Sequence, residues 1–595
     1  MSLYISRVQI SNFRNFHALD VCLSEKAVIV GENKSGKSNF IHALRLILDP
    51  DLPDSARELR DEDFWDGLES PTENGIEISI SIYLKGFEDN KSLLSILSDY
   101  LVEGEEPPTA RLTYKYMPLP SLRSKDGEPR YGFTVYGGDD PTNLFGYKER
   151  KWMPLQVLPA LRDAETDLEG WRRSPLRPLI DRLKITKQDL ESAATKIEEA
   201  TDEIRSLDEI RSLSRDIEQR LEEMIGKFHS VSPSLGVAST DALRLLRSLR
   251  LFVDGERQRS IGDASLGICN VLYLTLLMLE LERKEIASER ASTILAIEEP
   301  EAHLHPHLQR LVYHDFLRRE SCLLLTTHSP NIVSVSPIRS LVLIRDTGVQ
   351  DGSKANSTAK TEFNEEQVQD LERYIDATRG EILFASGVIL VEGDAELYVI
   401  PAFAEALGTP LDERGISVCS VQGTDFAPYV RLLGNSALDI PSVIITDGDP
   451  YIKQGEIFFR GVRRGISILQ LKRPNITVSL DKLFKEQKWD SLHKLFKRYG
   501  IYVGKNTLEI DLATSGNKKK MLTTLNELGA GQLLLNKFEE ALSSPEDNAT
   551  DIIRIIEIYG KGRYSQRLAN KLKNTNIPEH IEGAIKQIVK LVGTK

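Results

Sequence analysis

The feature that most constrains this chain of 595 residues is the octapeptide GENKSGKS at positions 31–38. An apolar run at 27–30 precedes it, and a helix-like stretch from Lys37 to Leu48 follows it. This is the GxxxxGK[ST] pattern in the strand–loop–helix context that the pattern requires. Successive backbone N–H groups of such a loop point inward at a helix N-terminus, which favours anions. We therefore expect an α/β fold with a nucleotide phosphate site.

The loop assigns a role to each of its polar residues. Lys37 is expected to reach the β- and γ-phosphates of ATP, and the Ser38 hydroxyl to bind one Mg²⁺ ion. Asn33 and Gly36 belong to the backbone that wraps the phosphates. A chance Gly/Ser turn is the alternative, and the flanking strand and helix argue against it.

A second acidic element follows far along the chain, in the segment ILAIEEP at 294–300. Glu298 is expected to complete the Mg²⁺ shell and Glu299 to orient or deprotonate the attacking water. A further apolar strand at 323–327 ends at His328, which could contact the γ-phosphate. Taken alone, a histidine in that position is more often structural.

Two apolar segments in the rear half also end in carboxylates, GVILVEGDAE at 387–396 and SVIITDGD at 442–449. Strands buried on both faces indicate a parallel sheet, whose ligands bind at the carboxyl ends of the strands. If these strands are neighbours, Glu392, Glu396, Asp447 and Asp449 converge. Carboxylates this close favour Mg²⁺ or Mn²⁺, and two such ions can hydrolyse a phosphodiester. Ordinary turn chemistry is the alternative, since Asp-Gly-Asp is also a good turn.

The remaining segments outline the domain organisation. Strand-like alternation occurs at 1–30, 75–85 and 111–117, and residues 350–366 are polar enough for a linker. Apolar residues recur at helical spacing over 183–225, which predicts a long amphipathic helix or a helical hairpin. That element is either an arm packed on its own domain or a dimerisation element, and the sequence favours neither.

The order of the front motifs carries a family resemblance. A phosphate loop, a long insertion, EEPEAHLHP at 298–306 and TTHSP at 326–330 resemble ABC-type ATPases of the SMC/RecF kind. Within these they resemble the OLD (overcoming lysogenization defect) family, to which Gabija-type nucleases belong. The opening ISNFRNF at 10–16 is similar to the first strands of that family, which assigns Arg14 to the nucleotide site.

The resemblance also implies a signature motif that completes the ATP site from a second subunit. The candidate is ASLGIC at 264–269, with Ser265 and Gly267 at the start of an apolar helix. It departs from the usual pattern, because Cys269 stands where a glutamine is common. Glu298 likewise replaces the usual aspartate. Both departures leave the hydrolysis rate open, whereas ATP binding is expected to survive.

VEG followed by DGD resembles the Toprim domain of topoisomerases, primases and OLD nucleases, over about 381–515. Glu396 is typical of the OLD branch, Glu509 matches a later acidic position, and KGRYSQRLA at 561–569 matches a basic motif in which Lys561 would stabilise developing charge. The resemblance implies an ABC-type P-loop ATPase followed by a Rossmann-like Toprim sheet and a helical C-terminal segment. The expected limits are 1–165 and 241–380 for the ATPase halves, 166–240 for a helical dimerisation insert, 381–515 for the Toprim domain and 516–595 for the helical part.

Local charge favours a nucleic-acid partner even though the net charge is -13. Residues 451–500 hold twelve Lys or Arg against four Asp or Glu, and 560–595 hold eight against two. Such residues contact phosphates without reading sequence, although a solvated basic face is the alternative. Aromatic residues among them could stack on bases but are more often core: Phe458, Phe459, Phe484, Trp489 and Phe496. Dispersed cysteines and the lack of a signal or membrane-spanning run indicate a cytoplasmic protein with reduced thiols.

These observations predict an ATP-regulated endonuclease that cuts DNA with two Mg²⁺ or Mn²⁺ ions in the Toprim site. The resemblance implies a role in defence against phage, as a homodimer or dimer of dimers, alone, with a helicase-like partner, or with a retron reverse transcriptase and its DNA. Two alternatives stay open. One is an ATP-switched scaffold or sensor whose Toprim domain binds without cutting, and the other is a nuclease that acts on RNA.

Overall fold

The computed structural model describes residues 3–593 apart from 124–128, 160–163, 171–173, 226–248, 255–258, 288, 319–321, 349–350, 376–378, 454–455, 477–478 and 574–575. Its contacts form two compact units. The first comprises Met1–Ala160, Ala291–Glu301 and Pro306–Lys595, and the second comprises Leu161–Arg290 with Ala302–His305.

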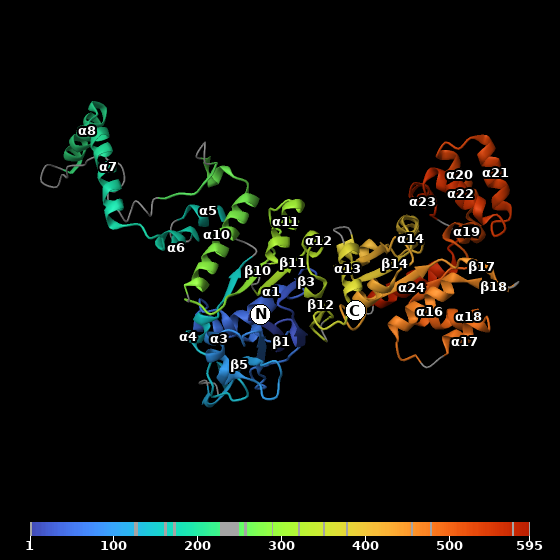
Figure 1. The fold of residues 1–595 in the computed structure, drawn as a ribbon, viewed down its shortest axis with the longest axis horizontal. Coiled ribbons are helices and arrows are strands. Elements are labelled where there is room, and N and C mark those ends of the chain that lie inside the picture. The colour runs from blue at the N-terminus through green and yellow to red at the C-terminus, as the bar shows by residue number, and fades with distance from the viewer. Residues whose placement is uncertain are drawn as a thin grey trace. The chain divides into compact units, whose positions relative to one another are not determined.

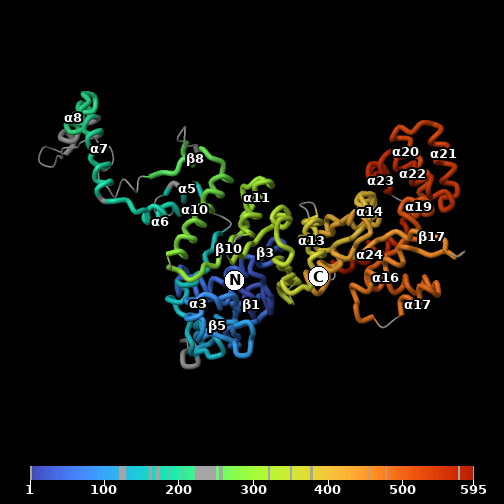
Figure 2. The backbone as a smooth tube through the Cα atoms, in the orientation of Figure 1, coloured from blue at the N-terminus to red at the C-terminus, as the bar shows by residue number. Residues whose placement is uncertain are grey.

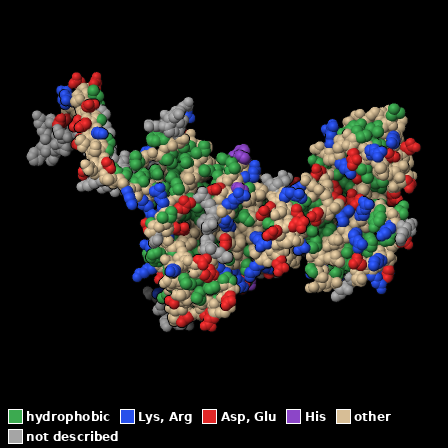
Figure 3. All heavy atoms as spheres, viewed as in Figure 1, with side chains coloured by type: hydrophobic (Ala, Val, Ile, Leu, Met, Phe, Trp, Pro, Cys, Tyr) green, Lys and Arg blue, Asp and Glu red, His purple; other side chains and the backbone are tan. Residues whose placement is uncertain are grey.

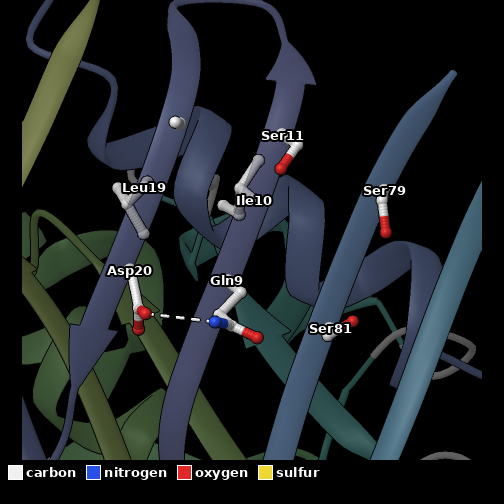
Figure 4. Close-up of a pocket in the computed structure, with 8 residues that line it drawn as sticks. Gln9, Ile10, Ser11, Leu19, Asp20, Ser79 and Ser81 are labelled. Carbon is white, nitrogen blue, oxygen red and sulfur yellow. Dashed lines mark hydrogen bonds between the residues drawn. The ribbon is translucent and has the colours of Figure 1, made fainter. Parts of the chain in front are cut away.

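The chain opens with an antiparallel sheet in the order β2-β1-β4-β5-β6, as the alternating sequence predicts. Its strands are β1 (Tyr4–Phe13), β2 (Phe16–Cys22), β4 (Ile78–Lys85), β5 (Ala110–Arg123) and β6 (Pro129–Gly137). Ile10 and Leu19 are buried, whereas their neighbours line a shallow polar depression on the other face, where Gln9 Nε2 donates to Asp20 Oδ2 at 3.0 Å (Figure 4). Short helices α2 (Asp54–Arg57), α3 (Lys91–Leu97) and α4 (Tyr147–Trp152) lie in the connections.

A second sheet carries the phosphate loop, in the order β13-β12-β3-β11-β10-β7. All its neighbours pair in parallel except the edge strand β13. The elements are β3 (Lys26–Val30), β7 (Leu155–Leu158), β10 (Ile294–Glu298), β11 (Leu323–Thr327), β12 (Leu341–Asp346) and β13 (Ser353–Ser357), with α1 (Lys37–Leu48), α11 (Pro306–Phe316), α12 (Pro330–Val333) and α13 (Glu365–Tyr374) (Figure 1). Helix α1 buries Phe40, Ile41 and Leu44 in one core shared by both sheets.

The interpretation of residues 350–366 as a linker is wrong in its central part. Residues Ser353–Ser357 form β13, which pairs antiparallel with β12 over the full length of the strand. An edge strand has one free side and half-exposed side chains, so a polar composition suits it as well as it suits a linker. Composition alone therefore could not distinguish the two.

The second unit is mainly helical. It contains α5 (Ala164–Glu169), α6 (Leu176–Asp181), α7 (Lys187–Ser206), α8 (Asp208–Ile225), β8 (Phe252–Asp254), β9 (Arg259–Ser260) and α10 (Leu266–Ile286). Helices α7 and α8 pack against each other as a hairpin, which confirms one of the two predicted forms (Figure 2). The expected insert continues to residue 240, but its part beyond residue 225 lies outside the described residues. Helix α10 leaves Leu266, Ile268 and Ile286 exposed, and hydrophobic side chains gather over it in Figure 3.

Within the first unit, a parallel sheet in the order β15-β14-β16-β19 forms the rear α/β part. Its elements are β14 (Gly387–Val391), α14 (Asp394–Ala406), β15 (Ile416–Ser420), α15 (Ala427–Leu433), β16 (Ser442–Thr446), α16 (Arg460–Lys472), α17 (Leu480–Lys485), α18 (Trp489–Arg498) and β19 (Ile501–Val503), with a hairpin of β17 (Pro450–Lys453) and β18 (Glu456–Phe459) (Figure 1). Strand β14 is buried along its whole length, as the apolar run predicts.

Helices complete this rear part: α19 (Leu508–Leu512), α20 (Lys518–Glu527), α21 (Gln532–Ser543), α22 (Ala549–Tyr559), α23 (Lys561–Ala569) and α24 (Glu579–Gly593). The last of them, α24, returns to pack on β14, β16 and β19, and α23 packs on α14. One hydrophobic core joins the sheet to these helices. The C-terminal segment is therefore part of the same packed unit as the sheet.

Among the residues that the structure describes, no helix has the length and apolar character needed to cross a membrane. Cys22, Cys269, Cys322 and Cys419 are all free thiols, as their spacing predicts.

Candidate functional site

The phosphate loop is formed around Lys37. Its side chain is only 5% exposed, and Nζ donates to the carbonyl oxygens of Gly31 and Glu32, each at 3.1 Å. Burial lowers the pKa of Lys37 from its ordinary value, while Glu299 and Glu301 act in the opposite direction. A desolvated ammonium held at the centre of a loop is suited to bind an anion such as the γ-phosphate of ATP.

The loop conformation depends on glycine and on a small amide network. Gly36 has φ +106°, and a Cβ there would lie 1.9 Å from Asn15 Nδ2. Asn15 Nδ2 instead donates to Ser35 O at 2.9 Å, and the buried Ser35 hydroxyl has no hydrogen-bond partner. The cradle and the unpaired hydroxyl both fit a bound phosphate. Asn33 and Ser38 are exposed at its mouth.

Arg14 lies beside this network. Its Nη1 donates to Asn39 Oδ1 at 2.9 Å, its Nε donates to Asp63 Oδ1 at 2.9 Å, and its guanidinium lies 5.2 Å from the centre of the Phe13 ring. Asn39 in turn donates to Asn15, so Arg14 connects to the loop through two amides. The contact of Arg14 with a nucleotide stays a prediction.

The acidic pair Glu298 and Glu299 stands at the carboxyl end of β10, which β11 separates from the phosphate-loop strand β3. Burial raises the pKa of Glu298, and the charge of Arg45 opposes that shift. Glu299 has φ +42° and its Oε1 lies 3.3 Å from His328 Nε2, at the end of β11. The backbone N–H of His328 donates to Glu301 Oε1 at 2.6 Å. The structure therefore brings Glu299 and His328 together, with Glu301 holding the histidine backbone.

The signature candidate begins α10 in the second unit. Ser265 is its N-cap, and Oγ accepts from the backbone N–H of Ile268 at 3.4 Å. A Cβ at Gly267 would lie 2.6 Å from the carbonyl oxygen of His303. The expected position at a helix N-terminus is confirmed for both residues, whereas their contact with a nucleotide stays a prediction.

The rear carboxylates meet at the carboxyl edge of the parallel sheet. Strands β14 and β16 are neighbours, so Glu392 follows one and Asp447 follows the other. Glu392 Oε1 accepts from the backbone N–H of Asp447 at 2.9 Å and from the Thr446 hydroxyl. The predicted convergence of Glu392 with Asp447 is therefore present.

Three further carboxylates, those of Glu396, Asp449 and Glu509, lie close to Asp447. Glu396 lies in the first turn of α14 and is 8% exposed, and Glu509 lies on α19 and is 6% exposed. Burial raises the pKa of Asp447 well above its usual range, and the charges of Glu392, Glu396, Glu509 and Asp449 raise it further. Burial also raises the pKa of Glu396 to about 7, with Glu509 and Glu392 adding to the effect. These groups need cations to ionise together.

Lys561 approaches this cluster from the C-terminal helices. Its Nζ lies 3.5 Å from Glu509 Oε1 and 3.7 Å from Glu557 Oε1. Burial alone would lower the pKa of Lys561, but the charges of Glu509 and Glu557 outweigh it and raise the pKa. Helix α23 reaches this place because it packs on α14 and because the buried Tyr564 hydroxyl donates to Met521 O at 2.9 Å.

The sequence interpretation missed Arg464, on α16. Its Nη2 donates to Glu392 Oε1, to Asp449 Oδ2 and to the carbonyl oxygen of Asp447, each at 2.8 Å. The helix can approach so closely because position 461 is glycine, where a Cβ would lie 1.8 Å from Asp447 O. Asp449 adopts φ +46° in this turn. No sequence signal distinguishes Arg464, because it stands beside Arg463 in a stretch rich in Lys and Arg.

The donor set fits divalent metal ions in its chemistry. Mg²⁺ and Mn²⁺ prefer the hard oxygens that Glu392, Glu396, Asp447, Asp449 and Glu509 supply. Within the described residues, however, no three His, Cys, Asp or Glu side chains already converge as ligands of one ion. Instead, Arg464 pairs with Glu392 and Asp449, and Lys561 pairs with Glu509.

Comparison with known families agrees with this architecture. Residues 383–449 match the family described as "Overcoming lysogenization defect protein-like, TOPRIM domain". Residues 3–125 and 147–333, more than half of the chain, match the AAA ATPase domain family. The chain belongs to the OLD family. Its AAA ATPase domain precedes an OLD-like Toprim domain, as the motifs predict.

Several OLD-family relatives align along most of this chain. Endonuclease GajA of Bacillus cereus (strain VD045) is 24% identical over 84% of this chain and 86% of its own length. OLD nuclease of Thermus scotoductus (strain ATCC 700910 / SA-01) is 25% identical over 75% of this chain and 82% of its own length. Among solved structures, the C-terminal region of the Burkholderia pseudomallei OLD protein is 34% identical, covering 35% of this chain and 99% of that chain, with a TM-score of 0.32.

Proposed function

We propose that this OLD-family chain is an ATP-controlled endonuclease that cuts DNA with divalent metal ions. The observation that carries the proposal is the gathering of four carboxylates around that of Asp447 at one sheet edge. A module that only binds nucleic acid has no use for so many like charges, which disfavour one another unless cations are bound. The names of the relatives, endonuclease GajA and OLD nuclease, support the same conclusion.

The rear site supplies the parts that phosphodiester hydrolysis needs. Two Mg²⁺ or Mn²⁺ ions, when bound, would activate water and stabilise the leaving oxygen. Glu392, Asp447 and Asp449 would hold them, with Glu396 and Glu509 as the additional ligands. Lys561 presents an ammonium at the edge of the cluster, where it would compensate negative charge on the phosphate.

The front site would bind ATP with one Mg²⁺. Lys37 would hold the phosphates through its ammonium, and Asn33, Gly36 and Arg14 would shape the surrounding loop. Ser38 and Glu298 would face the ion. Glu299 would orient the attacking water, and His328, 3.3 Å from it, would contact the γ-phosphate.

The proposal extends to partners and organisation. DNA is the expected substrate because of the basic stretches at 451–500 and 560–595. We infer a homodimer or dimer of dimers that completes its ATP sites with Ser265 and Gly267, and the exposed Leu266 and Ile268 beside them suit such an interface. The proposal also includes a cytoplasmic location and a role in defence against phage, alone or with a helicase or retron partner. Its domain limits are 1–165, 166–240, 241–380, 381–515 and 516–595.

Plasmid nicking tests it directly. The full chain is incubated with supercoiled plasmid and Mg²⁺ or Mn²⁺, with and without ATP, and with a structured RNA in parallel. Glu392→Ala and Asp447→Ala should abolish cutting. Glu405→Ala is the matched control, because Glu405 is an exposed acid on α14 and should leave the rate unchanged.

The outcomes separate the proposal from its alternatives. Cutting by both acidic variants at the wild-type rate would show that the assigned centre is wrong. Cutting of RNA but not of plasmid would replace the substrate and keep the site. Metal-independent DNA binding without cutting would indicate an ATP-switched scaffold instead.

A further inference from the structure

The side chain of Arg464 lies within the cluster of carboxylates. It is only 17% exposed, and it projects from α16 between the ends of β14 and β16. Its Nε donates to the Thr446 hydroxyl at 2.8 Å, and its Nη2 contacts Glu392 and Asp449. A single side chain thus pairs with two of the carboxylates that the proposed function assigns to metal binding.

Oxygen atoms surround Nη2 of Arg464. Three oxygens lie 2.8 Å from this one nitrogen, from Glu392, Asp449 and the backbone of Asp447. A guanidinium –NH₂ group has only two protons, so three acceptors exceed its donors. An oxygen cage with no directional demand suits a metal ion better than it suits a nitrogen with two fixed N–H bonds.

The carboxylates also divide between two resident cations. Arg464 contacts Glu392 and Asp449, whereas Lys561 contacts Glu509 from the other helical layer. Neither cation reaches Glu396 at ion-pair distance in the described part of the chain. The cluster therefore carries more acid than its two side-chain cations neutralise.

We propose that Arg464 is an exchangeable counter-cation, which occupies the position of one metal ion in the metal-free protein and is displaced when that ion binds. The inference rests on the proposed function, because it assigns Glu392 and Asp449 to the same metal. Both cations cannot contact these oxygens at once, since the guanidinium nitrogen already lies at their focus. Arg464 is thus a positioning residue that sets the affinity for metal.

The structure also offers a place for the displaced side chain. A cavity of about 380 Å³ adjoins Arg464 and is lined by Thr424, Asp425, Tyr451, Arg460, Arg463 and Ser467. Arg460 lies 5.5 Å from the centre of the Tyr451 ring. A third arginine released into this groove would increase its positive charge, which favours the phosphodiester backbone of the substrate. Metal loading would thereby strengthen phosphate binding beside the site.

The first test measures Mn²⁺ affinity of the full chain by titration calorimetry, without ATP or DNA. Arg464→Gln should bind the first Mn²⁺ roughly tenfold more tightly than wild type, because no ion pair must be broken first. Arg498→Gln is the matched control, since Arg498 is exposed at the end of α18 and does not line this cavity. It should leave the affinity unchanged. An Arg464→Gln affinity equal to or weaker than wild type overturns the inference.

The second test uses the wild-type protein, so it does not depend on a variant that folds. Phenylglyoxal modifies accessible guanidinium groups, and mass spectrometry reads the modification of each arginine. Labelling of Arg464 should rise severalfold when Mn²⁺ replaces EDTA, while labelling of the exposed Arg498 stays constant. Constant or reduced labelling of Arg464 would refute displacement.

The two levels of inference fail separately. If Glu392→Ala binds Mn²⁺ as well as wild type does, the metal site and the proposed function both fail. If Glu392→Ala loses the ion while Arg464→Gln and the labelling show no effect, only the exchange of Arg464 fails.

Discussion

Glu396 makes the metal-free protein less stable as pH rises, and Glu396→Gln should reverse this effect. The carboxyl is 8% exposed in the first turn of α14. Burial, followed by the charges of Glu509 and Glu392, raises its pKa to about 7 from an ordinary value of 4.5. Glutamine has nearly the same shape as the protonated acid and, like it, both donates and accepts hydrogen bonds, but it cannot ionise.

The size of the effect follows from proton linkage. Below the ordinary pKa, the carboxyl is protonated in both folded and unfolded protein and has no effect. Between pH 4.5 and 7 the folded protein retains a proton that the unfolded chain has released, so stability falls as pH rises. Above pH 7 the penalty is constant at about 3 kcal/mol, since a tenfold change in acidity corresponds to about 1.4 kcal/mol.

In the assay, the protein is unfolded by urea in EDTA at pH values between 5 and 8. A pulse of hydrogen exchange at fixed pH then measures unfolding in the peptides that cover β14 and β16. Such peptides isolate this sheet from the ATPase domain, which a global probe would not. Glu396→Gln should gain up to about 3 kcal/mol at pH 8 and little at pH 5. Glu405→Gln, on the exposed side of α14, is the control. A variant no more stable than wild type at pH 8 would refute the electrostatic argument.

Three other outcomes are expected. Lys37→Ala removes a buried ammonium, so affinity for a fluorescent ATP analogue should fall about a hundredfold, corresponding to about 3 kcal/mol; an unchanged affinity would place the nucleotide elsewhere. Gly461→Ala puts a Cβ 1.8 Å from Asp447 O and should weaken Mn²⁺ binding measured by calorimetry. Gly531→Ala is the control, because a Cβ there meets open space, and its stability should stay within about 1 kcal/mol of wild type. Lys561→Ala should slow plasmid nicking roughly 10²–10³-fold while Mn²⁺ still binds; a wild-type rate would remove Lys561 from the mechanism.

Much of the candidate site was predictable because its signals are local. The phosphate loop needs glycines and a lysine within eight residues, between a strand and a helix that its own neighbours specify. Glu392 and Asp447 were predictable as strand-end carboxylates for the same reason, since each follows its own apolar run. Helical spacing of apolar residues likewise predicted the helical character of α7 and α8, while the choice between one long helix and a hairpin required the structure.

Arg464 and the edge strand β13 were not predictable, because their roles depend on partners distant in the chain. Arg464 belongs to a stretch rich in Lys and Arg, and nothing within that stretch distinguishes it from the exposed Arg463. Only the docking of α16 through Gly461 brings it to Glu392, which lies seventy-two residues earlier. The polar strand β13 is recognisable only from its pairing with β12.

The sequence by itself determined the two chemistries, a phosphate loop at the front and strand-end carboxylates at the rear, because short-range backbone and side-chain preferences create them. The tertiary structure decided which groups share one site. Strand order made β14 and β16 neighbours, and helix packing brought Glu509, Lys561 and Arg464 to the same carboxylates. Electrostatic interaction depends on distance through space rather than along the chain, so the charge balance of this centre exists only in the folded protein.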